Sequence, residues 1–80
     1  MPTVEKIIEK MKTSPNSISP RELNRVLSNK GFNIKRQNGS HMIYTNDDGN
    51  MTIIIPKHNP IRQYYIEDTL IKIGEKDEKQ

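Results

Sequence analysis

Apolar side chains recur along the chain with two different periods. In three stretches they return every three or four residues, which is the spacing of one face of a helix. The residues on these faces are Val4, Ile7, Ile8 and Met11; Leu23, Val26 and Leu27; and Ile66, Leu70 and Ile73. The pattern predicts three helices, over residues 3–12, 20–30 and 64–73.

The second of these helices has the clearest boundaries. The run Ser19-Pro20-Arg21-Glu22 has the form of a capping box, in which Ser19 caps the first turn and Glu22 reaches back to the cap residue. Gly31 stands where a residue in the left-handed conformation commonly ends a helix. The helix is therefore expected to begin at Pro20 and to end just before Gly31.

Between the second and third helices the apolar period shortens to two, as in a half-buried strand. Three strands are predicted, over residues 32–36, 41–45 and 50–55, with the turn-forming run 46–49 before the third. The order α-α-β-β-β-α indicates an α+β fold in which helices cover one face of a small three-stranded antiparallel sheet. We expect a single domain over residues 1–80, with a polar, frayed tail at 75–80.

The strand pattern also assigns the two faces of the sheet. A four-residue loop would pair Thr45 with Asn50, and directly opposed residues share a face. The residues expected to face the helices are Phe32, Ile34, Met42, Tyr44, Met51, Ile53 and Ile55. The residues expected on or beside the open face are Asn33, Lys35, His41, Ile43, Thr45, Thr52 and Ile54. The imidazole of His41 should therefore stand in solvent.

Composition narrows the possible chemistry. The 80 residues include no cysteine, which excludes disulfides, zinc–thiolate sites and thiol nucleophiles. No apolar run approaches the roughly 20 residues of a membrane span and no signal peptide opens the chain, so a cytoplasmic protein is expected. Residues 1–66 carry a net charge of +5 and residues 67–80 a net charge of −2. A basic body favours a polyanionic partner, although a solubilising surface would explain it equally well.

Several kinds of site find no support in the sequence. The two histidines, His41 and His58, do not show metal-ligand spacing within one element, so no metal is expected. No Gly-rich phosphate loop is present, and no cofactor is expected. Ser40 and His41 are sequence neighbours, and a strand would point them to opposite faces, which is poor geometry for a hydrolytic triad.

Cleavage of RNA needs little more than the residues that remain. RNA supplies its own nucleophile, the 2′-OH beside the scissile phosphate, and histidine populates both protonation states near neutral pH. The cations that could hold and neutralise the phosphate are Lys35, Arg36, Lys57 and Arg62. From the residues alone, a half-exposed strand histidine without a role is the commoner explanation of His41. For His58 the corresponding explanation is a loop histidine that contacts backbone.

The tyrosines allow two interpretations. Tyr44, Tyr64 and Tyr65 could stack on bases, or they could pack in the core or at its boundary. The strand pattern turns Tyr44 inward and favours packing there, and it leaves Tyr64 and Tyr65 undecided.

The segment Gly31-Phe32-x-x-x-Arg36-Gln37-x-Gly39-Ser40-His41-x-x-Tyr44, with Ile55-Pro56-Lys57-His58 behind it, resembles the HicA-type toxins, a family of small mRNA interferases. The resemblance covers about residues 18–74, which would form the toxin core. It implies a double-stranded-RNA-binding-like fold, metal-independent cleavage of mRNA with His41 as the catalytic residue, and a HicB-like antitoxin as partner. The helix at 3–12 precedes the family core.

On this basis the chain is expected to be an endoribonuclease toxin. The residues expected to contact RNA are Lys35, Arg36, Gly39, Ser40, Lys57 and His58. The free toxin should be a monomer that forms a hetero-oligomer with its antitoxin, whose contact surface should be acidic. Two other interpretations stay open: a non-catalytic double-stranded-RNA-binding-like module, and a protein–protein adaptor without affinity for RNA.

Overall fold

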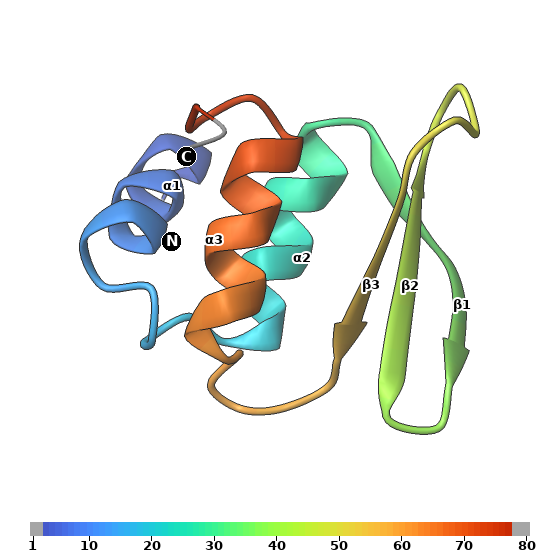
Figure 1. The fold of residues 1–80 in the computed structure, drawn as a ribbon, viewed down its shortest axis with the longest axis horizontal. Coiled ribbons are helices and arrows are strands. Elements are labelled where there is room, and N and C mark those ends of the chain that lie inside the picture. Colours follow the sequence, from blue (N-terminus) through green and yellow to red (C-terminus); the bar gives the residue numbers. More distant parts are fainter. Residues whose placement is uncertain (1–2, 78–80) are drawn as a thin grey trace.

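The computed structural model describes residues 3–77, apart from the side chains of residues 36–38. The elements in chain order are α1 (Val4–Thr13), α2 (Pro20–Asn29), β1 (Phe32–Asn38), β2 (His41–Asn46), β3 (Thr52–Pro56) and α3 (Gln63–Lys72). The strands form one antiparallel sheet in the order β1-β2-β3, and α2 and α3 lie between this sheet and α1 (Figure 1). The expected α+β fold, with the helices on one face of the sheet, is confirmed.

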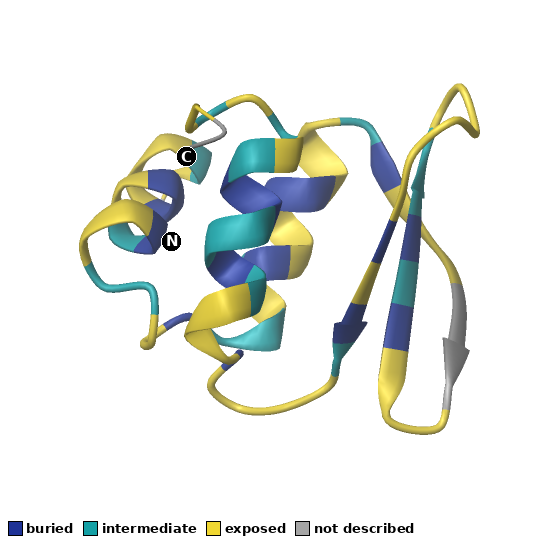
Figure 2. Ribbon diagram, viewed as in Figure 1, coloured by how far each residue is buried: buried dark blue, intermediate teal, exposed yellow. Residues whose placement is uncertain are grey.

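One hydrophobic core joins the three layers. The sheet contributes its helix-facing side chains, α2 and α3 contribute their apolar faces, and α1 closes the outer side (Figure 2). The buried apolar residues are Ile7, Ile8, Met11, Ile18, Leu23, Val26, Leu27, Phe32, Met42, Tyr44, Ile53, Ile55, Ile61, Ile66 and Leu70. Within the described residues, no helix has both the length and the apolar character needed to cross a membrane.

Side chains close the amino ends of α1 and α2. Thr3 Oγ1 accepts a hydrogen bond from the backbone N–H of Lys6 at 3.2 Å. At α2 both bonds of the predicted capping box form: Glu22 N–H donates to Ser19 Oγ at 3.1 Å, and Ser19 N–H donates to Glu22 Oε1 at 2.9 Å. The second oxygen of Glu22 accepts from Lys10 Nζ of α1 at 2.9 Å, which ties the two helices together.

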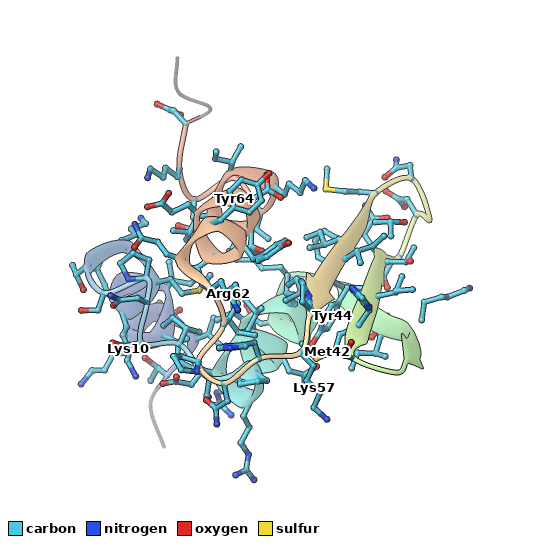
Figure 3. All side chains as sticks on the ribbon, turned by 60° about the horizontal axis from the view of Figure 1, so that its bottom comes forward. Lys10, Met42, Tyr44, Lys57, Arg62 and Tyr64 are labelled. Atoms are coloured by element: carbon cyan, nitrogen blue, oxygen red, sulfur yellow. The ribbon has the colours of Figure 1, made fainter. Side chains whose placement is uncertain are left out.

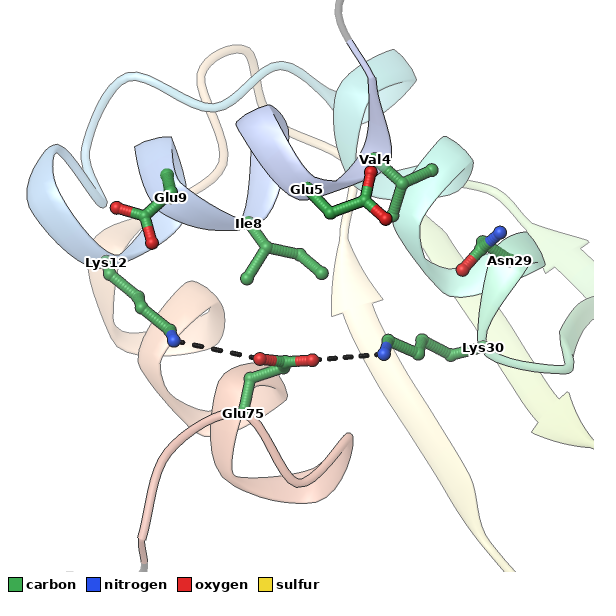
Figure 4. A pocket seen from close by; sticks show the side chains of 8 residues that line it. All are labelled: Val4, Glu5, Ile8, Glu9, Lys12, Asn29, Lys30 and Glu75. Atoms are coloured by element: carbon green, nitrogen blue, oxygen red, sulfur yellow. Dashed lines mark hydrogen bonds and ion pairs between the residues drawn. The ribbon is translucent and has the colours of Figure 1, made fainter.

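The carboxyl end of α3 is also closed. Gly74 has a φ of +81°, and the N–H groups of Gly74 and Glu75 bond the carbonyls of Ile71 and Leu70, as in a Schellman motif. The Glu75 carboxylate then lies between Lys30 Nζ at 3.0 Å and Lys12 Nζ at 3.7 Å, beside a pocket of about 260 Å³ (Figure 4). The expectation of a frayed tail from residue 75 is therefore wrong for Glu75, because two lysines distant in sequence hold it; residues 78–80 lie outside the described part of the chain.

The pairing of β2 with β3 differs from the predicted register by two residues. Thr45 pairs with Thr52 rather than with Asn50. The Asn46 side chain accepts the backbone N–H groups of Asn50 at 3.1 Å and Met51 at 3.2 Å, and so draws these residues into the loop. A shift of two residues preserves the faces of the strand. Met51, however, leaves the strand and is 37% exposed, so its expected place in the core is wrong.

Strand β1 departs from the regular pattern at Lys35. Ile34 pairs with Tyr44 and Arg36 with Ile43, so Lys35 is the extra residue of a β-bulge. Ile34 lies across from the buried Tyr44, yet it is 43% exposed because β1 is the edge strand and leaves it uncovered. The prediction that Ile34 belongs to the core is therefore wrong, whereas Phe32 is buried as predicted.

Candidate functional site

A two-residue turn joins β1 to β2 and presents the start of β2. Asn38 pairs with His41, and Gly39 and Ser40 form the loop between them. Gly39 has a φ of +61°, and glycine at the first central position is typical of a type II′ hairpin turn. A Cβ atom on Gly39 would meet no other atom within 4 Å, so the backbone conformation and not crowding calls for glycine here.

The loop after β3 is fastened to this turn. His41 pairs with Pro56, and the N–H of Lys57 donates to the carbonyl oxygen of Ser40, which extends the ladder by one bond. Residues far apart in sequence thereby meet at one end of the sheet. The residues of this place, which we call the turn end, are Gly39, Ser40, His41, Lys57 and His58, and all five are exposed.

His41 is the first residue of β2 and belongs to the open face of the sheet. The next residues on that face are Ile43 and its partner Ile54, which is 54% exposed. With respect to the side chains that the structure describes, the His41 imidazole makes no hydrogen bond or ion pair. No described side chain therefore occupies either ring nitrogen.

His58 is exposed as well, but its ring is held in place. Its Nδ1 lies 2.7 Å from the carbonyl oxygen of Pro60, which follows a cis peptide bond at Asn59. A carbonyl oxygen can only accept, so Nδ1 carries the hydrogen and Nε2 is left free. The sequence allowed for a backbone contact of His58 but held no signal for the carbonyl that makes it, because the direction of a loop carbonyl is not encoded in a local pattern.

The cations predicted to contact RNA are not all brought together. Lys57 lies at the turn end, and Arg62, at the N-cap of α3, lies on the same side of the molecule (Figure 3). Lys35 is exposed at the β1 bulge and lines a shallow pocket with residues of the β2–β3 hairpin, away from the turn. The backbone of Arg36 pairs with Ile43, and its side chain lies outside the described residues.

The tyrosines differ in their burial. Tyr44 is fully buried and donates from its hydroxyl to Asn24 Oδ1 at 3.1 Å, and burial raises the pKa of Tyr44. It therefore packs in the core, as the strand pattern favoured. Tyr64 is 70% exposed at the start of α3, with its ring edge-to-face against Tyr65 at 5.0 Å. Of the three, Tyr64 presents the most surface for stacking.

The turn end offers proton transfer and positive charge. In the stretch from residue 3 to residue 77 no three His, Asp or Glu side chains gather as metal ligands would. An exposed imidazole can take or give a proton, and a lysine at the same end of the sheet, such as Lys57, can neutralise an oxyanion. A basic α+β domain with such an edge is suited to a phosphodiester ligand.

Comparison with protein families identifies the class of this domain. The model of the HicA toxin of bacterial toxin–antitoxin systems matches residues 20–74. The match spans α2 to Gly74, more than half of the chain, and the chain therefore belongs to the HicA toxin family. Comparison with curated proteins and with solved structures gave no match. The helix α1, which packs on α2 and α3, precedes the matched segment.

Proposed function

We propose that this toxin is an endoribonuclease that cleaves mRNA, with His41 as its proton-transfer group. The observation that carries the proposal is an exposed imidazole that bonds no described side chain, with Lys57 one residue beyond its cross-strand partner, in a chain of the HicA toxin family. The non-catalytic alternative uses the same basic surface but gives no reason for a free imidazole at the turn.

The reaction uses the nucleophile of the RNA itself. His41 takes the proton of a 2′-OH, the 2′-oxygen attacks the adjacent phosphorus, and the bond to the 5′-oxygen breaks. General base help of this kind contributes about 10²–10⁴-fold to the rate. The products are a 2′,3′-cyclic phosphate and a 5′-OH end.

The other residues of the site hold the RNA. Lys57 neutralises the phosphate next to the turn, and the Gly39–Ser40 turn lets backbone approach the ribose closely. Lys35 and Arg36 extend the contact with RNA along β1, and His58 contacts the RNA from the loop after β3. These are phosphate and sugar contacts, so they position RNA without reading its bases.

The test compares purified wild type with His41→Ala on a long RNA, in the presence of a chelator. The matched control is Thr52→Ala, an exposed residue of the open face away from the turn end. We expect His41→Ala to lose at least ~100-fold in cleavage rate while Thr52→Ala cleaves like wild type. Equal cleavage by His41→Ala and wild type would remove His41 from the mechanism. Intact RNA with salt-sensitive binding by wild type would favour the non-catalytic module.

A toxin of this family implies an antitoxin, and we propose a HicB-like partner with an acidic contact surface. The basic body of residues 1–66 is the complement of such a surface. The partner would inhibit by covering the face of His41 or by filling the space beside it. Dissociation of the complex measured over a range of salt concentrations should show weakening as salt rises; insensitivity to salt would contradict an acidic contact.

A further inference from the structure

Cleavage by 2′-OH attack requires two proton transfers, and His41 can make only one of them at a time. The 5′-oxygen leaves as an alkoxide unless it gains a proton as its bond to phosphorus breaks. Once His41 has taken the 2′-OH proton, a different group must supply this second proton. This need rests on the proposed function and points to a donor near the same phosphate.

His58 is the second imidazole at the turn end and follows the strand that pairs with His41. His41 pairs with Pro56, and the Lys57–Ser40 bond carries the ladder one step further. His58 is therefore two residues beyond the partner of His41, just past the end of β3. In a regular antiparallel pair, diagonal neighbours are about 7–8 Å apart, and a continuation of β3 with this spacing would leave room for one phosphodiester between the two imidazoles.

The contact with Pro60 prepares the His58 ring for proton transfer. Because the carbonyl of Pro60 accepts from Nδ1 at 2.7 Å, Nε2 is the atom that gains and loses the proton. The protonated ring donates from both nitrogens, so the bond to Pro60 persists in both states. The loop need not move when His58 changes its charge.

The other charged groups near His58 are poorer candidates for the proton donor. The loop carries Lys57, Arg62 is the N-cap residue of α3, and β2 presents His41. The carboxylate at the start of α2, Glu22, is occupied by Ser19 and Lys10. Of these described groups, only the two histidines are of a residue type that exchanges a proton readily near neutral pH.

We propose that His58 is the proton donor to the leaving 5′-oxygen. In one step His41 takes the proton of the 2′-OH, the new bond from O2′ to phosphorus forms, and the bond from phosphorus to O5′ breaks. Nε2–H of protonated His58 gives its proton to O5′. The step leaves a 2′,3′-cyclic phosphate, a 5′-OH, a protonated His41 and a neutral His58, and exchange with water restores both rings.

The decisive experiment uses His58→Asn and His58→Ala on two substrates. Asparagine can still donate to the Pro60 carbonyl, so it keeps the loop contact but cannot transfer a proton. The first substrate is an ordinary oligoribonucleotide, and the second carries sulfur in place of the bridging 5′-oxygen, because a thiolate leaves without protonation. Thr52→Ala again serves as the control.

We expect both His58 variants to lose at least ~100-fold in kcat on the ordinary substrate, with one limb missing from the pH–rate profile. On the sulfur substrate they should cleave within a few-fold of wild type, whereas His41→Ala should stay impaired on both. Equal losses on both substrates, or wild-type behaviour of His58→Asn, would overturn the assignment. The proposed function fails separately, and this inference with it, if wild type cleaves neither substrate or if His41→Ala cleaves both like wild type.

Discussion

The helical side and the turn end of this small domain differ in how their key polar side chains are hydrogen-bonded. On the helical side, made of α1, α2 and α3, the capping box of α2 is complete and Glu75 is held by two lysines. At the turn end, His41 stands unbonded among the described side chains, and His58 keeps one nitrogen free. The turn end thus keeps imidazole nitrogens available to a ligand, whereas the carboxylates of Glu22 and Glu75 on the helical side are paired with lysines.

This difference means that stability and activity depend on separate residues. The helical side contributes most of the buried apolar residues, while each residue of the turn end is exposed. Exposed residues without partners usually change the free energy of unfolding by less than about 0.5 kcal/mol when they are substituted. Substitutions on the two sides should therefore affect different measurements.

The strongest test of this separation is Leu27→Ala. Leu27 of α2 is fully buried in the core, and the truncation should lower the free energy of unfolding by about 2–5 kcal/mol. Denaturant unfolding measures this loss, and RNA cleavage per folded molecule should be unchanged. His41→Ala should give the reverse result, with normal unfolding and lost cleavage. A Leu27→Ala protein that is fully folded but inactive would contradict the separation.

The fold could be predicted from the sequence because its main signals are local. The helix periods, the capping box and the glycines at +87° and +81° each depend on a few neighbouring residues. The faces of β2 and of residues 52–55 were correct even though the register was wrong, because a two-residue error preserves the alternation; Met51 and Ile34 were the exceptions. The error arose because the Asn46 side chain accepts two backbone amides of the loop. The alternation of apolar and polar residues carries no signal for such a bond.

The candidate site could be predicted only in part. The exposed position of His41 followed from the alternation along β2, and the structure has it there. The bond from Lys57 to Ser40, the anchoring of His58 by Pro60 and the separation of Lys35 at the bulge depend on how distant segments meet. Those contacts, rather than the residue types, decide which of the predicted residues could share one phosphate.

A second test concerns the one buried polar atom on the helical side for which no partner is found in the described chain. Thr69 of α3 is fully buried, and its Oγ1 makes no hydrogen bond with any residue that the structure describes. Thr69→Val removes this hydroxyl at nearly constant volume and should raise the free energy of unfolding by about 1 kcal/mol. The control Thr69→Ser keeps the hydroxyl and loses the methyl group, and it should be less stable than wild type. A loss of stability in the valine variant would show that the hydroxyl has a partner.

The smallest expected effect separates the charge of the capping box from its hydrogen bonds. Burial disfavours the ionised form of Glu22, but the hydrogen bonds from Ser19 and Lys10 and the charge of Lys10 outweigh it and lower the pKa of Glu22. A carboxylate with a lowered pKa stabilises the fold above its unfolded pKa, near ~4.3, and loses that contribution as the pH falls through the folded pKa.

Glu22→Gln keeps an oxygen for the Ser19 amide and removes the charge that faces Lys10. At pH 7 the variant should be less stable than wild type by about 0.5 kcal/mol, and the difference should vanish by about pH 3. The lowered pKa of Glu75, caused by its bond to Lys30 and the charges of Lys30 and Lys12, acts in both proteins and cancels from the difference. Denaturant unfolding at pH 7, 5 and 3, with Glu9→Gln as an exposed control on α1, measures the effect. A difference that stays constant down to pH 3 would mean that the amide, and not the lost charge, is responsible.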